Sequence, residues 1–399
     1  MAKLIEITGK AIAGEWGTDD PAGTGIPVLR TTNFTNDGVV DYKDVVTRTI
    51  AKKNLNDKYL RNGDIIIEKS GGSDKQPVGR VIYYDGPKQT YLFNNFTGLL
   101  RVKDQTAWLP RYVFYALFCN YTMGGTRAYE NRTTGLHNLQ TDGYISSFEV
   151  PSISMQKQCE ICANMDTIMH LIVLKKEQLA KLDELVKSRF VEMFGDADLA
   201  QTRPEWRFVS EIGTVVGGAT PKTTNDEFWD GIYRWITPAE LENESGYIFD
   251  SVRKITEAGV KSCALTELPI GTVILSSRAP IGKVAIAGNT FYCNQGFKNI
   301  ICNQDINPVF LYSLLRMNTG YLNSLGRGAT FKEISKAIVE NIRIPVPPRM
   351  QQDRFAAFVA EVDKSKFRIQ KSLSIGRKLW TMAQIDAIMN MDFSTQRSL

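Results

Sequence analysis

The residues best suited to chemistry in this chain are few and scattered. Cys159 and Cys162 form a CxxC pair, which is half of a tetrahedral zinc site, but no second CxxC and no pair of nearby histidines completes the four ligands. The chain holds two histidines, His137 and His170, so little imidazole is present for acid–base catalysis. We therefore interpret both cysteines as helix positions and expect no metal site.

Two further fragments point weakly to enzymes that act on nucleic acids. Asp64, Glu68 and Lys69 combine carboxylates with a lysine, as metal-dependent nucleases do, yet their spacing is common. Residues 307–310 (Asn-Pro-Val-Phe) are similar to the Asn-Pro-Pro-aromatic motif of amino-methyltransferases, but the second proline and any glycine-rich cofactor motif are missing. We favour a strand edge for the first fragment and a helix N-cap followed by proline for the second. No catalytic residue and no cofactor bound by this chain are predicted.

Length and composition describe a folded protein of two or three domains. The chain has 399 residues, of which 43% are hydrophobic and 23% charged, and these are ordinary globular values. No apolar run approaches the roughly 20 residues that cross a bilayer, and the first residues lead into no signal-peptide segment. The six cysteines show no disulfide framework. We expect a cytoplasmic protein without a membrane partner.

Charge is distributed unevenly, although the net charge is only +5. Residues 268–332 contain six bases and one acid, and residues 86–129 contain five bases and one acid. Residues 205–267 instead contain eleven acids and six bases. A polyanion would be attracted to the basic segments and repelled by the acidic one. Chance clustering is the alternative interpretation.

The chain contains an internal repeat. Val150-Pro151 followed by Gln158 matches Ile344-Pro345 followed by Gln352, at an offset of 194 residues. Each match opens a segment whose apolar residues follow the four-three spacing of a coiled-coil seam. The seam positions are residues 161, 165, 168, 172, 175, 179, 182, 186, 189 and 193, and the same positions shifted by 194 in the second copy.

Landmarks upstream of each helix recur in the same order. Residues 25–32 parallel 231–238, residues 63–67 parallel 271–275, residues 79–81 parallel 282–284, and residues 91–95 parallel 291–295. Residues 110–117 and 308–315 both read as helices that begin with proline. The repeated unit is therefore a whole mixed domain followed by a long helix.

The predicted boundaries are a mixed domain at 1–150, a helix at 151–196, a second mixed domain at 197–344, a second helix at 345–393 and a tail at 394–399. Each helix of about 40 residues would be roughly 60 Å long and must bury its apolar seam. The other helix is the nearest candidate. We favour antiparallel pairing over parallel pairing. The second domain follows directly on the end of the first helix, so it should lie at the opposite end of that helix from the first domain.

Two similar but divergent domains on a spacer suit a ligand with two different features along one axis. Duplex DNA is such a ligand, since its major groove returns to the same face about every 34 Å. Asn94-Asn95 stands opposite Asn294-Gln295, and residues 135–138 (Gly-Leu-His-Asn) stand opposite residues 328–331 (Gly-Ala-Thr-Phe). These differences indicate two unlike half-sites.

This pattern resembles the specificity subunit of Type I restriction–modification systems over essentially the whole chain. The likeness is strongest at residues 217–221, leading through Trp229 to residues 235–237, at residues 344–348 before Gln352, and at residues 328–335. The first domain departs more from the family, since residues 150–154 lack the double proline.

The resemblance implies an α+β fold with two mixed α/β target-recognition domains, related by a pseudo-twofold repeat and separated by two long antiparallel coiled-coil helices. It implies a non-catalytic protein that reads a bipartite, asymmetric site in double-stranded DNA. The partners would be two methyltransferase subunits, which carry S-adenosylmethionine and modify adenine N6, and a restriction motor-nuclease subunit. A two-lobed DNA nuclease and a protein-binding scaffold are the alternatives.

Two sets of candidate site residues follow. The predicted DNA-binding residues are Lys69, Arg80, Asn94, Asn95, Arg127, Arg132, Arg278, Lys283, Asn294, Gln295, Arg327, Thr330 and Lys332. The bases would neutralise phosphates or read guanine, and the polar residues would meet base edges. The predicted partner-docking residues are Leu171, Phe190, Phe358, Phe367 and Leu379, which broaden the apolar surface of the helices.

Overall fold

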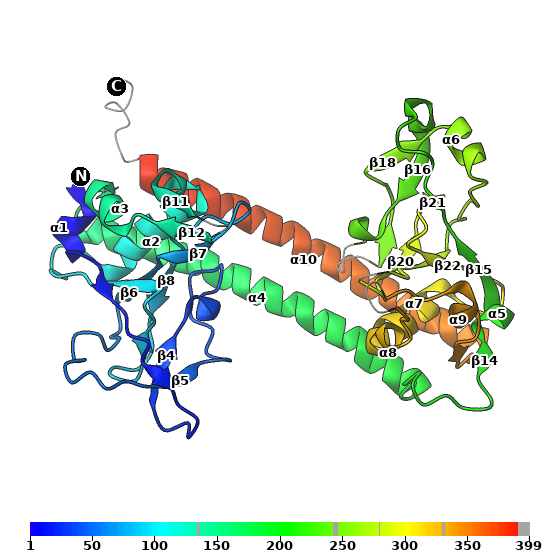
Figure 1. The fold of residues 1–399 in the computed structure, drawn as a ribbon, viewed down its shortest axis with the longest axis horizontal. Coiled ribbons are helices and arrows are strands. Elements are labelled where there is room, and N and C mark those ends of the chain that lie inside the picture. Colours follow the sequence, from blue (N-terminus) through cyan, green and yellow to red (C-terminus); the bar gives the residue numbers. More distant parts are fainter. Residues whose placement is uncertain (134–135, 242–245, 279, 329–331, 390–399) are drawn as a thin grey trace. The chain divides into compact units, whose positions relative to one another are not determined.

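A computed structural model describes residues 1–133, 136–241, 246–278, 280–328 and 332–389 (Figure 1). The chain divides into two compact units. Unit 1 comprises residues 1–176 and 371–399, and unit 2 comprises residues 177–370. Two long helices, α4 (Met155–Phe194) and α10 (Arg349–Met389), each contribute one part to unit 1 and another part to unit 2. No helix within the described ranges is both long and apolar enough to span a membrane.

Unit 1 is built around two four-stranded sheets with strand orders β2-β10-β6-β8 and β3-β5-β4-β9. Its other elements form a three-stranded sheet, β11-β12-β7, and the pair β1-β13. All five residues of the central strand β6 are buried, including the carboxylates Asp64 and Glu68 at its two ends. The elements in chain order are β1 (Ala2–Lys3), α1 (Leu4–Thr8), β2 (Ile12–Ala13), β3 (Thr18–Asp19), β4 (Ile26–Leu29), η1 (Thr31–Asn33), β5 (Val46–Thr49), β6 (Asp64–Glu68), β7 (Ser70–Gly72), β8 (Val81–Tyr84), β9 (Leu92–Phe93), β10 (Thr97–Leu100), α2 (Pro110–Thr122), η2 (Gly125–Tyr129), β11 (Glu130–Thr133), β12 (Leu136–Leu139), α3 (Thr141–Ser147) and β13 (Glu149–Val150).

Unit 2 is built around a five-stranded sheet of order β15-β22-β19-β20-β17, with the smaller sheets β18-β16-β21 and β14-β23. Its elements are β14 (Arg207–Phe208), α5 (Val209–Ile212), β15 (Gly213–Gly217), η3 (Asp226–Phe228), β16 (Trp229–Ile236), η4 (Pro238–Glu240), β17 (Tyr247–Ile248), β18 (Arg253–Ile255), α6 (Glu257–Ser262), β19 (Val273–Leu275), β20 (Val284–Ala287), β21 (Tyr292–Cys293), β22 (Lys298–Cys302), α7 (Pro308–Met317), α8 (Thr319–Ser324), α9 (Lys336–Glu340) and β23 (Arg343–Ile344).

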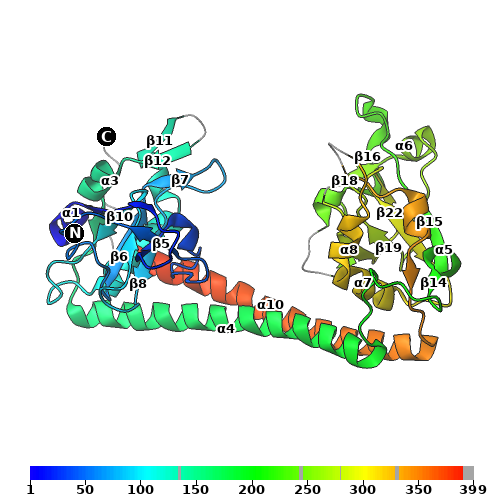
Figure 2. The same cartoon turned by 60° about the horizontal axis from the view of Figure 1, so that its bottom comes forward.

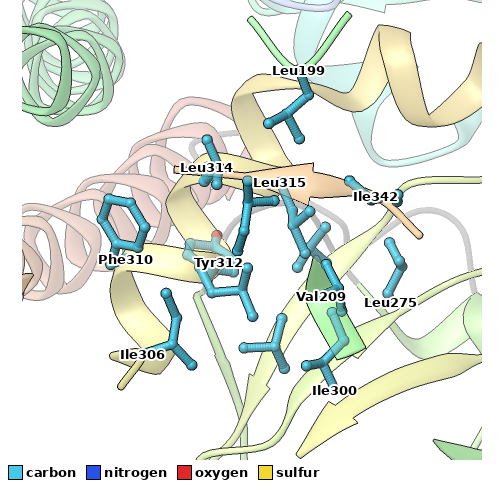
Figure 3. Packing of buried hydrophobic residues seen from close by; sticks show 14 of the residues in the cluster. Leu199, Val209, Leu275, Ile300, Ile306, Phe310, Tyr312, Leu314, Leu315 and Ile342 are labelled. Atoms are coloured by element: carbon cyan, nitrogen blue, oxygen red, sulfur yellow. The ribbon is translucent and has the colours of Figure 1, made fainter. Parts of the chain in front are cut away.

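The five-stranded sheet is buried on both faces. In β19, Val273 and Leu275 enter the core formed with α7, whereas Ile274 between them enters a second core on the opposite face. Figure 3 shows the first core, in which α7 places Leu314 and Leu315 close to the sheet. Burial on both faces explains why the strand reads as a continuous apolar run rather than an alternating one.

The two units repeat one topology. In unit 1, β6 pairs antiparallel with β8 and β10, and β4 pairs parallel with β9. In unit 2, β19 pairs antiparallel with β20 and β22, and β16 pairs parallel with β21. Helices α2 and α7 both begin with proline. Apart from β10 and β22, each of these matched elements coincides with a predicted landmark pair, so the predicted repeat of mixed domains is confirmed.

The predicted antiparallel helix pair is also confirmed within each unit (Figure 2). In unit 2, the Lys366 ammonium of α10 lies 2.6 Å from the Asp183 carboxylate of α4. In unit 1, Gly376 of α10 lies against Ile172 of α4. The predicted seam residues are buried or half-buried wherever their side chains are described, whereas most of their helical neighbours are exposed.

A buried glutamine joins each domain to its long helix. Gln158 of α4 accepts a hydrogen bond from the Leu109 amide, directly before α2, over 2.8 Å. Gln352 of α10 accepts one from the Asn307 amide, directly before α7, over 2.7 Å. Both side chains are fully buried. The sequence landmark at offset 194 is therefore a matched structural clamp.

Candidate nucleic-acid interface

The carboxylates of the nuclease-like fragment are occupied by arginines. Arg101 donates from Nε and from a terminal nitrogen to the two Asp64 oxygens, each over 2.7 Å. Arg80 lies 3.3 Å from the Glu68 carboxylate, whose side chain is 4% exposed. Burial raises the pKa of Glu68, and Arg80 opposes that rise. Both carboxylates are therefore buried and paired with arginines at the two ends of β6.

The methyltransferase-like fragment is a helix cap, as the preferred interpretation predicts. The Asn307 side-chain oxygen accepts a hydrogen bond from the Val309 amide over 2.8 Å, and Pro308 occupies the first position of α7. The Asn307 side-chain amide donates to Asp353 over 2.8 Å. Both ends of this amide are therefore used inside the protein.

In each unit, the residues that follow the central strand pair with a segment from much later in the chain, and these segments form two matched hairpins. In unit 1, the Leu139 amide of β12 donates to the Lys69 carbonyl over 2.9 Å. In unit 2, the Ile334 amide donates to the Ser277 carbonyl over 2.9 Å. These equivalent bonds align β12 of unit 1 with the segment around Glu333 of unit 2.

In unit 2, the aligned positions carry charged side chains. We call this group the Glu333 cluster; it consists of Arg278, Lys298, Arg327 and Glu333. Arg327 and Arg278 both pair with Glu333 across antiparallel bridges, so the three side chains lie on one face. The Glu333 carboxylate lies 3.1 Å from Arg278 Nε and 3.2 Å from Lys298 Nζ. Burial acts to raise the pKa of Glu333, but the hydrogen bonds and charges of Lys298 and Arg278 outweigh it and lower that pKa. The cluster carries three cations and one anion.

In unit 1 the equivalent positions carry neutral side chains, the Asn138 triplet, consisting of Ser70, Asn131 and Asn138. Asn138 pairs with both Asn131 and Ser70 across antiparallel registers. Asn131 is exposed and accepts a hydrogen bond from Gln140 over 2.8 Å, whereas Asn138 is half-buried. Amides and a hydroxyl thus occupy the places that two arginines and a glutamate occupy in unit 2.

His137, the residue before Asn138, contacts Glu130 within the unit 1 hairpin. Its imidazole is buried, with Nδ1 3.0 Å from the Glu130 carboxylate. The other oxygen of Glu130 accepts a hydrogen bond from the Val78 amide over 3.0 Å. This contact ties the hairpin to the neighbouring loop and holds the Asn138 triplet in place.

Two predicted DNA-binding residues make hydrogen bonds inside unit 1. The Arg80 guanidinium donates to the carbonyls of Thr31 and Phe34, each over 2.9 Å, in addition to its contact with Glu68. Asn94 is 4% exposed and accepts a hydrogen bond from Thr97 over 3.2 Å. Both side chains are hydrogen-bonded inside unit 1, Arg80 through its two terminal nitrogens and Asn94 through its side-chain oxygen, and their contact with DNA stays a prediction.

The remaining candidates divide by exposure. Those exposed to solvent are Asn95, Arg127, Arg278, Gln295, Arg327 and Lys332. Those half-buried are Lys69, Lys283 and Asn294. Burial lowers the pKa of Lys69, and Asn294 accepts a hydrogen bond from the Gly296 amide over 2.9 Å. The Arg132 side chain and Thr330 lie outside the described residues.

Sequence reasoning missed five members of the two hairpin groups, namely Ser70, Lys298, Glu333, Asn131 and Asn138. Lys298 lies in the basic segment and Asn138 in the divergent segment at 135–138, so both carried a weak signal. Glu333 lies in the family-like segment at 328–335. Ser70 and Asn131 carried no signal, because only the cross-strand register brings them beside the others.

The docking candidates differ in accessibility. Phe367 is 67% exposed, Leu171 is 51% exposed and Leu379 is 49% exposed. Phe358 is half-buried beneath the Arg189 guanidinium, which lies 5.7 Å from its ring centroid. Phe190 is fully buried and stacks on Phe310 of α7 at 5.3 Å between ring centroids. Phe190 is a core residue, so its prediction as a docking residue is wrong.

Comparison with known proteins gives concordant matches. The family model described as the Type I restriction modification DNA specificity domain matches residues 3–184 and 205–375. The Type I restriction enzyme MjaIX specificity subunit of Methanocaldococcus jannaschii is 39% identical over 184 residues, which is 45% of this chain and 43% of that protein. This alignment thus spans less than half the length of that relative. A second chain of that organism, named as the MjaX specificity subunit, is 23% identical over 93% of this chain and 89% of its own.

Solved structures match along nearly the whole chain. The Type I restriction–modification S subunit from M. genitalium aligns with a TM-score of 0.55 at 14% identity, covering 96% of this chain and 94% of that one. A chain from a study of complex assembly and conformational transition in the type I R-M system aligns with a TM-score of 0.55 at 17% identity, covering 97% and 96%. At these identities the likeness concerns the fold.

Proposed function

Because the chain belongs to the family of Type I restriction modification DNA specificity domains, we propose that it is the non-catalytic, sequence-reading subunit of a Type I restriction–modification complex. Each unit reads one half of a bipartite, asymmetric site in double-stranded DNA. The two long helices set the spacer between the halves. The chain holds no S-adenosylmethionine of its own, since the methyltransferase partner supplies it.

The observation that carries this proposal is the pair of matched hairpins with unlike side chains. A repeated topology supports two readers of the same kind, and different residues at equivalent positions support two different half-sites. Exposed cations in both units, such as Arg127 in unit 1 and Arg278, Arg327 and Lys332 in unit 2, suit the phosphate backbone.

The long helices are proposed to dock two methyltransferase subunits and, through them, the restriction motor-nuclease subunit. Large apolar side chains are exposed along both helices, which is unusual for a surface without a partner. The exposed set is Leu171, Val173, Leu174, Leu185 and Val191 on α4 and Met350, Phe367, Ile375 and Leu379 on α10. Phe358 is half-buried and would contribute less apolar surface than these residues.

Exchange of one domain tests the sequence-reading role. Residues 205–343 are replaced by the equivalent segment from a relative of different specificity, and the methylated sites of the assembled complex are sequenced. One half of the bipartite target should change, while the other half and the spacer length stay fixed. A change in both halves, or in the spacer, would contradict the modular proposal.

The absence of catalysis has its own test. The chain purified to homogeneity should neither methylate nor cleave DNA, and activity should appear only when the partner subunits are added. Transfer of a methyl group by the chain alone would overturn the non-catalytic assignment.

A further inference from the structure

We propose that the Glu333 cluster and the Asn138 triplet are matched base-reading positions, with guanine read by Arg278 in unit 2 and adenine read by Asn138 in unit 1. This inference rests on the proposed function and names which residues discriminate. It follows from the equivalent placement of the two groups and from the hydrogen-bonding capacity of their side chains.

Backbone hydrogen bonds show which positions of the Asn138 triplet and the Glu333 cluster are equivalent. The Glu68 amide donates to the Arg80 carbonyl over 2.8 Å, and the Ser276 amide donates to the Lys283 carbonyl over 2.9 Å. Counting two residues onward from each amide places Ser70 and Arg278 at the same position. On the partner strand, Asn138 and Glu333 occupy the same position by the bonds described above.

Arg278 is held by only part of its guanidinium. Its Nε faces the Glu333 carboxylate at 3.1 Å, and its side chain is 47% exposed. Among the described residues, its two terminal nitrogens have no hydrogen-bond partner. A guanidinium fixed at Nε presents these terminal nitrogens as a fork, and such a fork matches the O6 and N7 acceptors of guanine.

Glu333 acts as a positioning residue in this arrangement. Its carboxylate also faces Lys298 Nζ at 3.2 Å, and the Lys298 side chain is only 14% exposed. Lys298 therefore holds the Glu333 carboxylate in position, and this carboxylate in turn holds the Arg278 guanidinium through Nε. The acid has a second effect, because a carboxylate near the phosphate backbone repels DNA of any sequence.

Asn138 offers both a donor and an acceptor at the equivalent place. An asparagine amide matches the N6 donor and N7 acceptor of adenine. Within the described part of the chain, the Asn138 side chain has no hydrogen-bond partner. Asn131, by contrast, already accepts a hydrogen bond from Gln140.

The experiment uses the full chain assembled with its methyltransferase partner and a duplex library randomised across both half-sites. Arg278→Ala should relax one position of one half-site from guanine to any base and weaken binding to the preferred site about 5- to 150-fold. Arg278→Lys keeps the charge but loses the fork, so it should lose the same discrimination while binding random DNA as the wild type does. Asn138→Ala should relax one adenine position of the other half-site.

Glu333→Gln gives a signature that a purely structural role would not produce. Discrimination at the Arg278 position should fall, while affinity for random DNA should rise because one negative charge is removed. Lys261→Ala is the matched control, since Lys261 is an exposed lysine of unit 2 paired with Glu257 at 2.6 Å. It should change neither property. Amide hydrogen exchange of the hairpin confirms that each variant remains folded.

The outcomes separate the two levels of the proposal. A wild-type complex with no sequence preference would overturn both the proposed function and this inference. A specific wild type whose Arg278→Lys and Asn138→Ala variants keep full discrimination would overturn the inference alone. A change of the preferred base in Glu333→Gln, with Arg278→Ala unaffected, would assign the reading to Glu333 and also overturn it.

Discussion

Replacing Gln352 by methionine should destabilise unit 2 strongly, although the side chain keeps nearly the same size. Gln352 accepts a hydrogen bond from the Asn307 amide over 2.7 Å and donates to the carbonyls of Asp305 and Pro347 over 3.0 and 2.7 Å. The residue is fully buried, so water cannot replace these bonds. Methionine removes all three.

The expected loss in the free energy of unfolding follows from the backbone groups that Gln352→Met leaves without a hydrogen-bond partner. Leaving the Asn307 amide without its acceptor costs about 1–3 kcal/mol, and leaving the two carbonyls without their donor costs roughly 1 kcal/mol each because a carbonyl tolerates under-satisfaction better. The free energy of unfolding of unit 2 should therefore fall by about 3–5 kcal/mol. Gln158→Met should produce a loss of the same size in unit 1, since Gln158 bonds to Leu109, Ala107 and Ile153 in the same pattern.

The assay must resolve the two units, because a chain of two units does not unfold in one two-state step. Amide hydrogen exchange with mass spectrometry in increasing urea measures residues 308–317 and 110–122 separately. Gln351→Met is the control, since Gln351 is exposed beside Gln352. A loss below about 1 kcal/mol in Gln352→Met, or a loss equal to that of Gln351→Met, would refute the clamp.

Three further results are expected. Phe367→Asp should weaken binding of the methyltransferase subunit in a titration without altering the exchange protection of unit 2, because the ring is 67% exposed; unchanged binding would contradict the docking proposal. The Glu333 carboxyl has a lowered pKa, so its contribution to hairpin protection should be complete above about pH 4.5 and lost as the pH falls through that lowered pKa; protection in Glu333→Gln should not show this loss. Arg101→Ala should lower the free energy of unfolding of unit 1 by about 3 kcal/mol, because it leaves Asp64 charged, buried and without its guanidinium; a loss near that of an exposed arginine variant would count against this.

The features predicted best from the sequence are those with a local period or a long internal offset. The four-three spacing identified the helix faces that meet, because 3.5-residue periodicity follows directly from helix geometry. The offset of 194 residues placed Gln158 and Gln352 at matching positions of the repeat, but it carried no sign of the hydrogen bonds that both side chains make. Both the four-three spacing and the 194-residue offset can be recognised from the order of residues in the sequence alone.

The fate of individual polar residues depended on neighbours far along the chain. Arg80, directly before β8, and Arg278, shortly after β19, are both arginines beside a buried strand and look alike in sequence. The Thr31 and Phe34 carbonyls each accept a hydrogen bond from a terminal nitrogen of Arg80. The described residues give Arg278 a single carboxylate partner, Glu333, at its Nε. Phe190 shows the same limit on a helix, since the heptad finds the face toward α10 but not the face that packs on α7.

The two hairpin groups differ in chemistry while their backbone bonds coincide, and this has a physical reason. The hairpin is held by backbone hydrogen bonds, such as Leu139 to Lys69 and Ile334 to Ser277, and these do not depend on side-chain identity. The side chains of Asn131, Arg278 and Arg327 are exposed or ion-paired at the surface, where substitutions usually change stability by about 0.5 kcal/mol or less. Side chains at these positions are therefore free to differ between the units without loss of the fold, which is the property that a surface for reading two unlike sequences requires.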